Sequence, residues 1–162
     1  MTAATAPPLS WYESSEDAKR LLIAASQTWE NTAASEQFML QALAQPEPAL
    51  DVLVSAYRFF FYKNNNSMAL QMAQQVMARV KATEGLPDDW TQLQPLLTAR
   101  KEEPNIRLYL NAYAASGFVL ARLGQTEDAL AIASRVKSLD DRNEFGARTV
   151  LDILTRPADD DD

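Results

Sequence analysis

The chain has 162 residues, enough for one domain with its own apolar core, and it contains no cysteine and no histidine. A disulfide is therefore excluded, and so are the usual zinc, copper and haem sites, which depend on cysteine or histidine ligands. The net charge of −7 opposes binding to nucleic acid or to an anionic membrane, because long-range repulsion acts against both. We expect no metal, no cofactor, no nucleic-acid partner and no membrane partner.

Residues 1–12 precede the first helical pattern, and we expect them to form a disordered N-terminal tail. They lack the basic and apolar regions of a secretory signal, and no apolar run in the chain is long enough to cross a bilayer. We therefore expect a cytoplasmic protein. One helical domain is predicted over 13–156, followed by a second disordered tail over 157–162, which is acidic.

The composition predicts an all-α fold. Glycine is rare, and apolar residues recur three and four positions apart instead of alternating. The first helix is expected to begin at Ser14 or Ser15, because "SSED" supplies a capping serine followed by acids in the first turn. A second helix is expected over about 35–45 and is ended by Pro46, which cannot donate a backbone hydrogen bond.

The third and fourth predicted helices are separated by the turn "NNNS". The third helix is expected over about 49–63. Asn66 or Ser67 is the expected N-cap of the fourth helix. Gly85 is expected to take the left-handed conformation just after that helix.

An insertion is predicted over about 85–104. Within it, 88–97 is expected to form a short helix that is interrupted near Pro95. The insertion is irregular in sequence, and we expect Trp90 to pack it against the rest of the domain.

Three helices are predicted after the insertion. A fifth helix is predicted over 104–123 and is ended by Gly124, and Thr126 is the expected cap of a sixth helix. A seventh is predicted over about 143–154. The expected total is about six to seven helices.

A repeat-like pattern occupies residues 114–141, "ASGFVLARLGQTEDALAIASRVKSLDD". Gly117 and Ala129 are small enough to let two antiparallel helices approach closely, and Gly124 permits the tight turn between them. This segment resembles the tetratricopeptide repeat. The resemblance implies a short right-handed stack of antiparallel helical hairpins, with a compact unrelated bundle as the alternative.

A weaker copy of the pattern lies at residues 50–80, with Ala56 at the small position. Its turn is expected to be one residue longer and contains asparagine in place of glycine. The stronger copy also departs from the family, since Asp140 and Asp141 stand where a proline is usual. The insertion accounts for the wide separation of the two copies.

Five aromatic residues occur within six positions of the third predicted helix, "YRFFFY" at 57–62. At about 100° per residue the rings surround the helix, so neighbours must enclose it or one face must meet a partner. Packing accounts for three of the rings. Phe59 and Tyr62 remain open between the core and a concave groove. Arg58 and Lys63 flank them, and aromatic and arginine side chains are common in binding hot spots.

The later helix "NIRLYLNAYAAS" is expected to extend this groove. Its residue Asn111 carries an amide that can bond a partner's extended backbone, although a solvated helix position is the simpler interpretation. The predicted partner-binding residues share polar tips or aromatic rings, and they are Arg58, Phe59, Tyr62, Lys63, Arg107, Tyr109, Asn111 and Tyr113.

We expect no enzymatic activity. Without histidine or cysteine, catalysis would depend on carboxylates, lysine or tyrosine. The adjacent pairs Asp88–Asp89 and Glu102–Glu103 lie beside predicted helix starts, where acids are favoured electrostatically. No glycine-rich phosphate loop is present in the sequence.

The segments "AYRFFFYK", "GLPDDW" and "GFVLARLGQTEDAL" together resemble small helical-repeat proteins of bacterial nitrogen-fixation gene clusters. This resemblance implies an accessory protein that binds a nitrogenase component or an assembly intermediate. The chain is also similar in size and acidity to the tetratricopeptide chaperones of type III secretion. We therefore expect a non-catalytic adaptor or assembly chaperone with another protein as its partner. A small-ligand or enzymatic pocket under the aromatic residues is the alternative from a different class.

Overall fold

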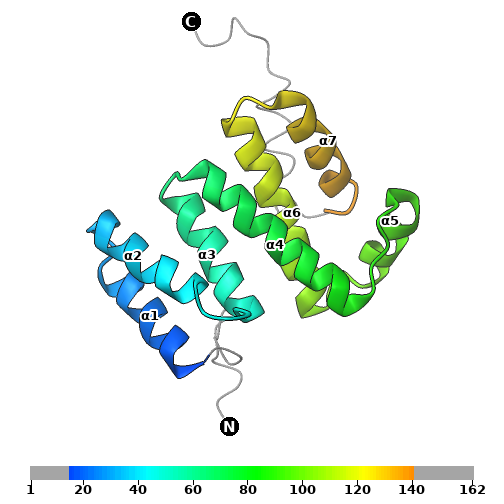
Figure 1. Cartoon of the computed structure of the whole chain (residues 1–162). Helices are drawn as coiled ribbons and strands as arrows, with labels where there is room; N and C mark the ends of the chain where they lie inside the picture. The colour runs from blue at the N-terminus through cyan, green and yellow to red at the C-terminus, as the bar shows by residue number, and fades with distance from the viewer. Residues whose placement is uncertain (1–14, 141–162) are drawn as a thin grey trace, which may run out of the picture.

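The computed structural model describes residues 15–140, and within them it contains seven α-helices and no strand (Figure 1). The all-helical prediction is confirmed. The two predicted tails and the helix predicted over 143–154 lie outside the described residues. The helices are α1 Glu16–Gln27, α2 Thr32–Leu43, α3 Leu50–Tyr62, α4 Asn66–Glu84, α5 Trp90–Ala99, α6 Pro104–Arg122 and α7 Thr126–Lys137.

The helices pair as three hairpins, α1–α2, α3–α4 and α6–α7 (Figure 1). The second and third hairpins are joined by extensive packing of α4 along α6, while α3 also touches α1, α2 and α6. The α5 helix lies in the connection between the second and third hairpins (Figure 1). Stacked helical hairpins are therefore present, and the finer right-handed tetratricopeptide geometry stays a prediction.

Side-chain caps decide where four of the described helices begin, namely α1, α2, α4 and α5. Ser15 accepts a hydrogen bond from the first turn of α1, as predicted. Asn31 caps α2 in the same way, so α2 begins at Thr32 and not near residue 35. Asn65 caps α4, one residue before the predicted Asn66. Both helices begin earlier than predicted for the same reason. An asparagine that precedes the apolar pattern accepts a hydrogen bond from an amide of the first turn, and the helix therefore begins at the residue after it.

The turns of the second and third hairpins are identical in form. Asn64 and Gly124 both take left-handed backbone conformations, with φ of 62° and 83°. The next amide, of Asn65 or Gln125, donates to the carbonyl five residues back at 2.9 Å in both turns. The prediction of a longer turn in the weaker copy is therefore wrong, because asparagine tolerates this conformation. Thr126, predicted as a cap, is instead the first residue of α7.

Gly117 lies where α6 and α7 pack closely together. A Cβ atom at this position would lie 2.9 Å from Cγ2 of Ile132 and 3.8 Å from the carbonyl oxygen of Ala129. The predicted contact between Gly117 and Ala129 is confirmed. The 60-residue offset that aligns the two turns places Tyr57 opposite Gly117, so the assignment of Ala56 to the small position of the weaker copy is wrong.

The α5 helix is continuous through Pro95, so the predicted interruption is wrong. A proline at this position removes the amide that would bond the carbonyl of Thr91. Both residues are exposed, which leaves that carbonyl open to water. Leu93 and Leu97 are buried, and their packing holds the helix against the domain.

A polar cluster joins the ends of α4 and α5 to the start of α6. Arg100 pairs with both Glu84 and Glu103, and Asn105 donates to Glu84 at 2.9 Å. The hydrogen bonds from Asn105 and Arg100 hold the pKa of the Glu84 carboxyl below its usual value. Arg100 likewise lowers the pKa of Glu103. This cluster fixes the position of the insertion.

The α3 helix lies at the centre of the first two hairpins, which explains its aromatic sequence. Ala56 and Phe60 are almost fully buried, and Tyr57 is 4% exposed, as predicted for core residues. Phe61 is half-buried and packs edge-on against Phe118 of α6, with ring centroids 5.6 Å apart. Over residues 15–140, no helix is both long and apolar enough to cross a membrane.

Candidate functional site

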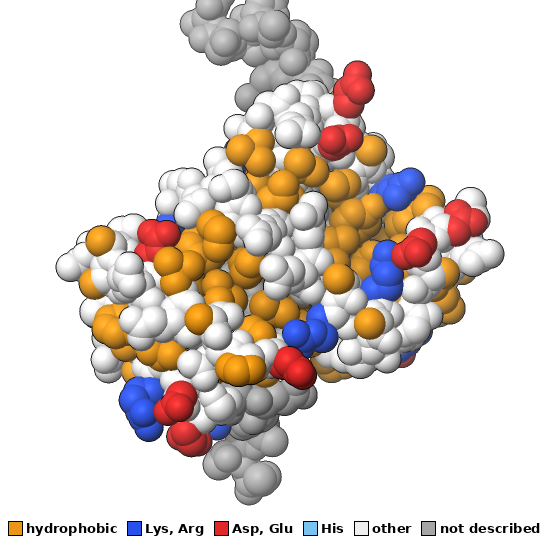
Figure 2. Space-filling view, in the orientation of Figure 1, with side chains coloured by type: hydrophobic (Ala, Val, Ile, Leu, Met, Phe, Trp, Pro, Cys, Tyr) orange, Lys and Arg blue, Asp and Glu red, His pale blue; other side chains and the backbone are white. Residues whose placement is uncertain are grey.

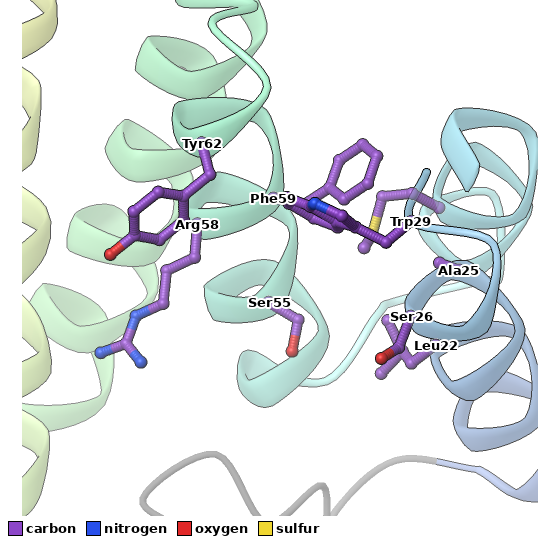
Figure 3. A pocket seen from close by; sticks show the side chains of 9 residues that line it. Leu22, Ala25, Ser26, Trp29, Ser55, Arg58, Phe59 and Tyr62 are labelled. Atoms are coloured by element: carbon purple, nitrogen blue, oxygen red, sulfur yellow. The ribbon is translucent and has the colours of Figure 1, made fainter. Parts of the chain in front are cut away.

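An open cleft lies between α1 and α3, with a volume of about 200 Å³ (Figure 3). We call it the α1–α3 cleft. The first hairpin supplies one wall, including Trp29 in the connection between α1 and α2, and α3 supplies the other. Its lining consists of Leu22, Ala25, Ser26, Trp29, Met39, Ser55, Arg58, Phe59 and Tyr62.

Helical spacing places the α3 wall. Ser55, Phe59 and Tyr62 are separated by four and three positions, so they share one face of the helix. Phe59 is 6% exposed, and its ring meets Trp29 edge-on at 5.6 Å. Tyr62 is 69% exposed. Phe59 and Tyr62, which the sequence left open between core and groove, therefore differ: Phe59 forms the buried wall of the cleft, and Tyr62 projects from its rim.

Arg58 and Lys63 add positive charge to this rim. Nζ of Lys63 lies 3.9 Å from the centre of the Trp29 ring and donates to the Trp29 carbonyl at 2.5 Å. Figure 3 shows the side chains of Arg58 and Tyr62 projecting from α3 away from Trp29. The Arg58 guanidinium also lies near the ring of Tyr57, at 5.9 Å. Burial raises the pKa of Tyr57, and the hydrogen bond with Arg58 offsets part of that rise.

The four predicted residues of α6 do not join this cleft. Tyr109 and Tyr113 are 2% and 8% exposed, so the expectation that they extend an exposed groove is corrected. They belong to the stripe of α6 that packs into the core, and burial raises the pKa of Tyr109 to about 12. Arg107 lies 4.0 Å from Glu102, and Asn111 is half-buried. Partner contact by Arg107 or Asn111 stays a prediction.

Trp29 is a cleft residue that was not among the predicted partner-binding residues. It follows the spacing of the apolar residues of α1, but α1 ends at Gln27 and Trp29 lies in the connection to α2. Its position beside the cleft could have been inferred from its spacing, since Leu22, Ala25 and Trp29 are separated by three and four positions. A tryptophan at the end of such a stripe, 38% exposed, closes one side of the cleft.

The carboxylates of the two adjacent acidic pairs take part in a helix cap and in ion pairs. Asp89 caps α5 and accepts from the Thr91 amide at 3.2 Å. Asp88 pairs with Lys81 at 2.9 Å. In residues 15–140 no three acidic side chains lie close enough together to hold a metal ion.

A second depression, of about 450 Å³, lies between α4, α6 and α7 and is lined in part by Tyr113, Asp128, Ile132 and Arg135. Arg135 donates to the Tyr113 hydroxyl at 3.3 Å and also lies over the Trp90 ring, with 4.9 Å to its centre. Figure 2 shows hydrophobic side chains gathered in the hollow between α4, α5 and α7, with charged side chains beside them. The lining of the second depression contains both an acidic residue, Asp128, and a basic residue, Arg135, whereas the α1–α3 cleft is apolar with a cationic rim.

No protein-family model and no solved structure matched the chain. A curated protein of Azotobacter chroococcum mcd 1 does match, under the name "Uncharacterized 19.8 kDa protein in nifW 5'region". The two are 37% identical over 134 residues, which cover 81% of this chain and 74% of the relative. A relative from a nif region agrees with the resemblance to proteins of nitrogen-fixation gene clusters. The chain belongs to the same family as this 19.8 kDa protein of the nifW 5′ region.

Proposed function

We propose that the protein is a non-catalytic binding module that holds a partner protein of nitrogen fixation in the α1–α3 cleft. The observation that carries this proposal is Tyr62, which is 69% exposed at the rim of an otherwise apolar cleft. Large exposed aromatic side chains beside an arginine are typical of binding hot spots, since they bury much area when a partner excludes water. Arg58 stands next to Tyr62 on the same rim.

The relative supports the setting of this activity. Its name places it in a nif region, which favours a role in nitrogen fixation over type III secretion. We infer that the partner is a nitrogenase component or an assembly intermediate, met in the cytoplasm. The protein then acts as an adaptor or assembly chaperone.

The size of the cleft disfavours the alternative of a small-ligand or catalytic pocket. Small-molecule sites usually enclose about 300–1,000 Å³ and bury most of their ligand. The α1–α3 cleft is smaller, at about 200 Å³, and is open along one side. Such a cleft fits one or two side chains of a protein partner better than a whole cofactor or substrate.

The test uses the full chain, tagged and expressed in a nitrogen-fixing host. Wild type, Tyr62→Ala and Leu96→Ala are purified, and co-purified proteins are quantified by mass spectrometry. Leu96 on α5 is the matched control, since it is a large apolar side chain, 38% exposed, outside the cleft. We expect one protein to be recovered stoichiometrically with wild type and Leu96→Ala.

Recovery with Tyr62→Ala should fall at least about tenfold, the loss expected for a hot-spot side chain. Circular dichroism should show the same helicity in all three proteins. A lone chain that retains a small molecule, or equal recovery with all three, would contradict the proposal.

A further inference from the structure

Three cations near the α1–α3 cleft lack an acidic partner. Within residues 15–140, no carboxylate lies within 4.0 Å of Arg58, Lys63 or Arg122. Several other described cations are paired, among them Lys19 with Glu16, Arg20 with Asp17, Lys81 with Asp88, and Arg100 with Glu84 and Glu103. Arg79, Arg135 and Lys137 also have no carboxylate of the described residues within that distance, but they do not line this cleft.

Aromatic rings hold the three cations near the cleft in place and link them. The Arg122 guanidinium lies over the ring of Phe61, 4.5 Å from its centre, and donates to the Phe61 carbonyl at 3.2 Å. Phe61 in turn meets Tyr62 edge-on at 5.4 Å. Lys63 lies over Trp29 on the other side. The cations and their rings therefore extend from the first hairpin to the third, and we call Arg58, Lys63 and Arg122 the cationic rim.

The cationic rim contrasts with the charge of the rest of the molecule. The chain carries 22 acidic residues against 15 basic ones, yet no acidic residue lines the α1–α3 cleft. A cation stacked on an aromatic ring keeps its charge and its remaining hydrogen-bond donors. Three such cations beside an apolar cleft are complementary to carboxylates beside an apolar side chain.

We propose that the partner presents an acidic segment to the cationic rim and inserts an aliphatic or aromatic side chain of that segment into the α1–α3 cleft. The inference rests on the proposed function, since it names the chemistry of the partner at the same cleft. The carboxylates bond Arg58, Lys63 and Arg122, and the apolar side chain packs against Trp29 and Phe59. A nucleic acid is the less favoured polyanion, because the net charge of −7 repels a continuous phosphate backbone.

The first test identifies the sequence that docks. A photo-crosslinking phenylalanine derivative replaces Tyr62 in the full chain in a nitrogen-fixing host, and the crosslinked peptide is sequenced by mass spectrometry. We expect a peptide of another protein with several aspartates or glutamates next to an apolar residue. A neutral or basic peptide would overturn this inference and leave the proposed function standing.

The other outcomes of the crosslink are also decisive. A crosslink to residues 157–162 of the same chain, or to a second copy, would show that the acidic occupant is not a partner protein and would overturn the inference. A crosslink to nucleic acid would do the same. No crosslink to any protein would instead overturn the proposed function itself.

The second test measures the charges directly with the crosslinked segment as a synthetic peptide. The double variant Lys63→Gln and Arg122→Gln is compared with a control double variant, Lys19→Gln and Arg20→Gln, which removes two cations of α1 that lie outside the cleft. We expect the first to bind about fivefold more weakly at low salt and to lose most of the salt dependence. The control should bind like wild type. Equal affinities for both double variants would contradict the cationic rim.

Discussion

Replacement of Gly117 by alanine tests how closely α6 and α7 pack. In an exposed helix, glycine to alanine stabilises by about 1 kcal/mol, because glycine loses more backbone freedom on folding. Here the new Cβ would lie 2.9 Å from Cγ2 of Ile132. That methyl group is held by a branched side chain with one preferred helical rotamer, so it cannot swing aside. Overpacking of this kind costs about 1–3 kcal/mol, so Gly117→Ala should destabilise the protein by about 1 kcal/mol.

The partner residue supplies the control for this prediction. Ile132→Ala removes the obstructing methyl group, and in that background Gly117→Ala should stabilise by about 1 kcal/mol, as at an ordinary helix position. Urea unfolding of the four proteins, followed by far-ultraviolet circular dichroism, gives the coupling, which we expect to be about 2 kcal/mol. A gain in stability from Gly117→Ala in both backgrounds would refute the close packing of the two helices.

The remaining predictions concern the aromatic helix, the polar cluster and a buried phenol. Phe60→Ala should cost about 3–5 kcal/mol in urea unfolding, since Phe60 is 1% exposed, whereas Tyr62→Ala should change stability by less than about 0.5 kcal/mol. Equal losses would place both rings in the core. Arg100→Gln should destabilise the protein at neutral pH, because it removes the ion pair with Glu84. The pKa of Glu84 is lowered in the folded protein, so this ion pair stabilises the fold above the usual carboxyl pKa, and the stabilisation is lost as the pH falls through the lowered pKa. The difference from wild type should therefore shrink in acid, and an unchanged difference would count against this pairing. Tyr109→Phe should remove the phenol that ionises near a pKa of about 12 in an ultraviolet titration. The variant should also lose less stability than wild type as the pH rises from the usual tyrosine pKa to that value. An unchanged titration would show that another group ionises there.

Local signals in the sequence predicted much of the fold. The serine cap of α1, the left-handed Gly85 and Gly124, and the close approach at Gly117 all follow from the steric needs of single residues. The start of α2 was placed too late because its apolar pattern begins after the capping Asn31. A cap that precedes the periodic residues carries no hydrophobic signal of its own.

The candidate site was predictable only in part, for a geometric reason. Arg58, Phe59 and Tyr62 share one helix, so their relative placement follows from helical spacing. Whether Tyr109 and Tyr113 joined them depended on which stripe of α6 faces α4, and that is a property of tertiary packing. Both tyrosines carry a polar tip, which allows either a buried or an exposed position.

Amide hydrogen exchange of the chain, free and in complex with the co-purified partner, tests most directly the claim that the α1–α3 cleft is the docking site. The peptides spanning residues 26–31 and 61–66 contain Trp29, Tyr62 and Lys63 and the connections that follow α1 and α3. We predict that these two peptides exchange more slowly in the complex, while peptides of α5 and α7 keep the rates of the free chain. Protection confined to α5 and α7, with 26–31 and 61–66 unchanged, would contradict the account.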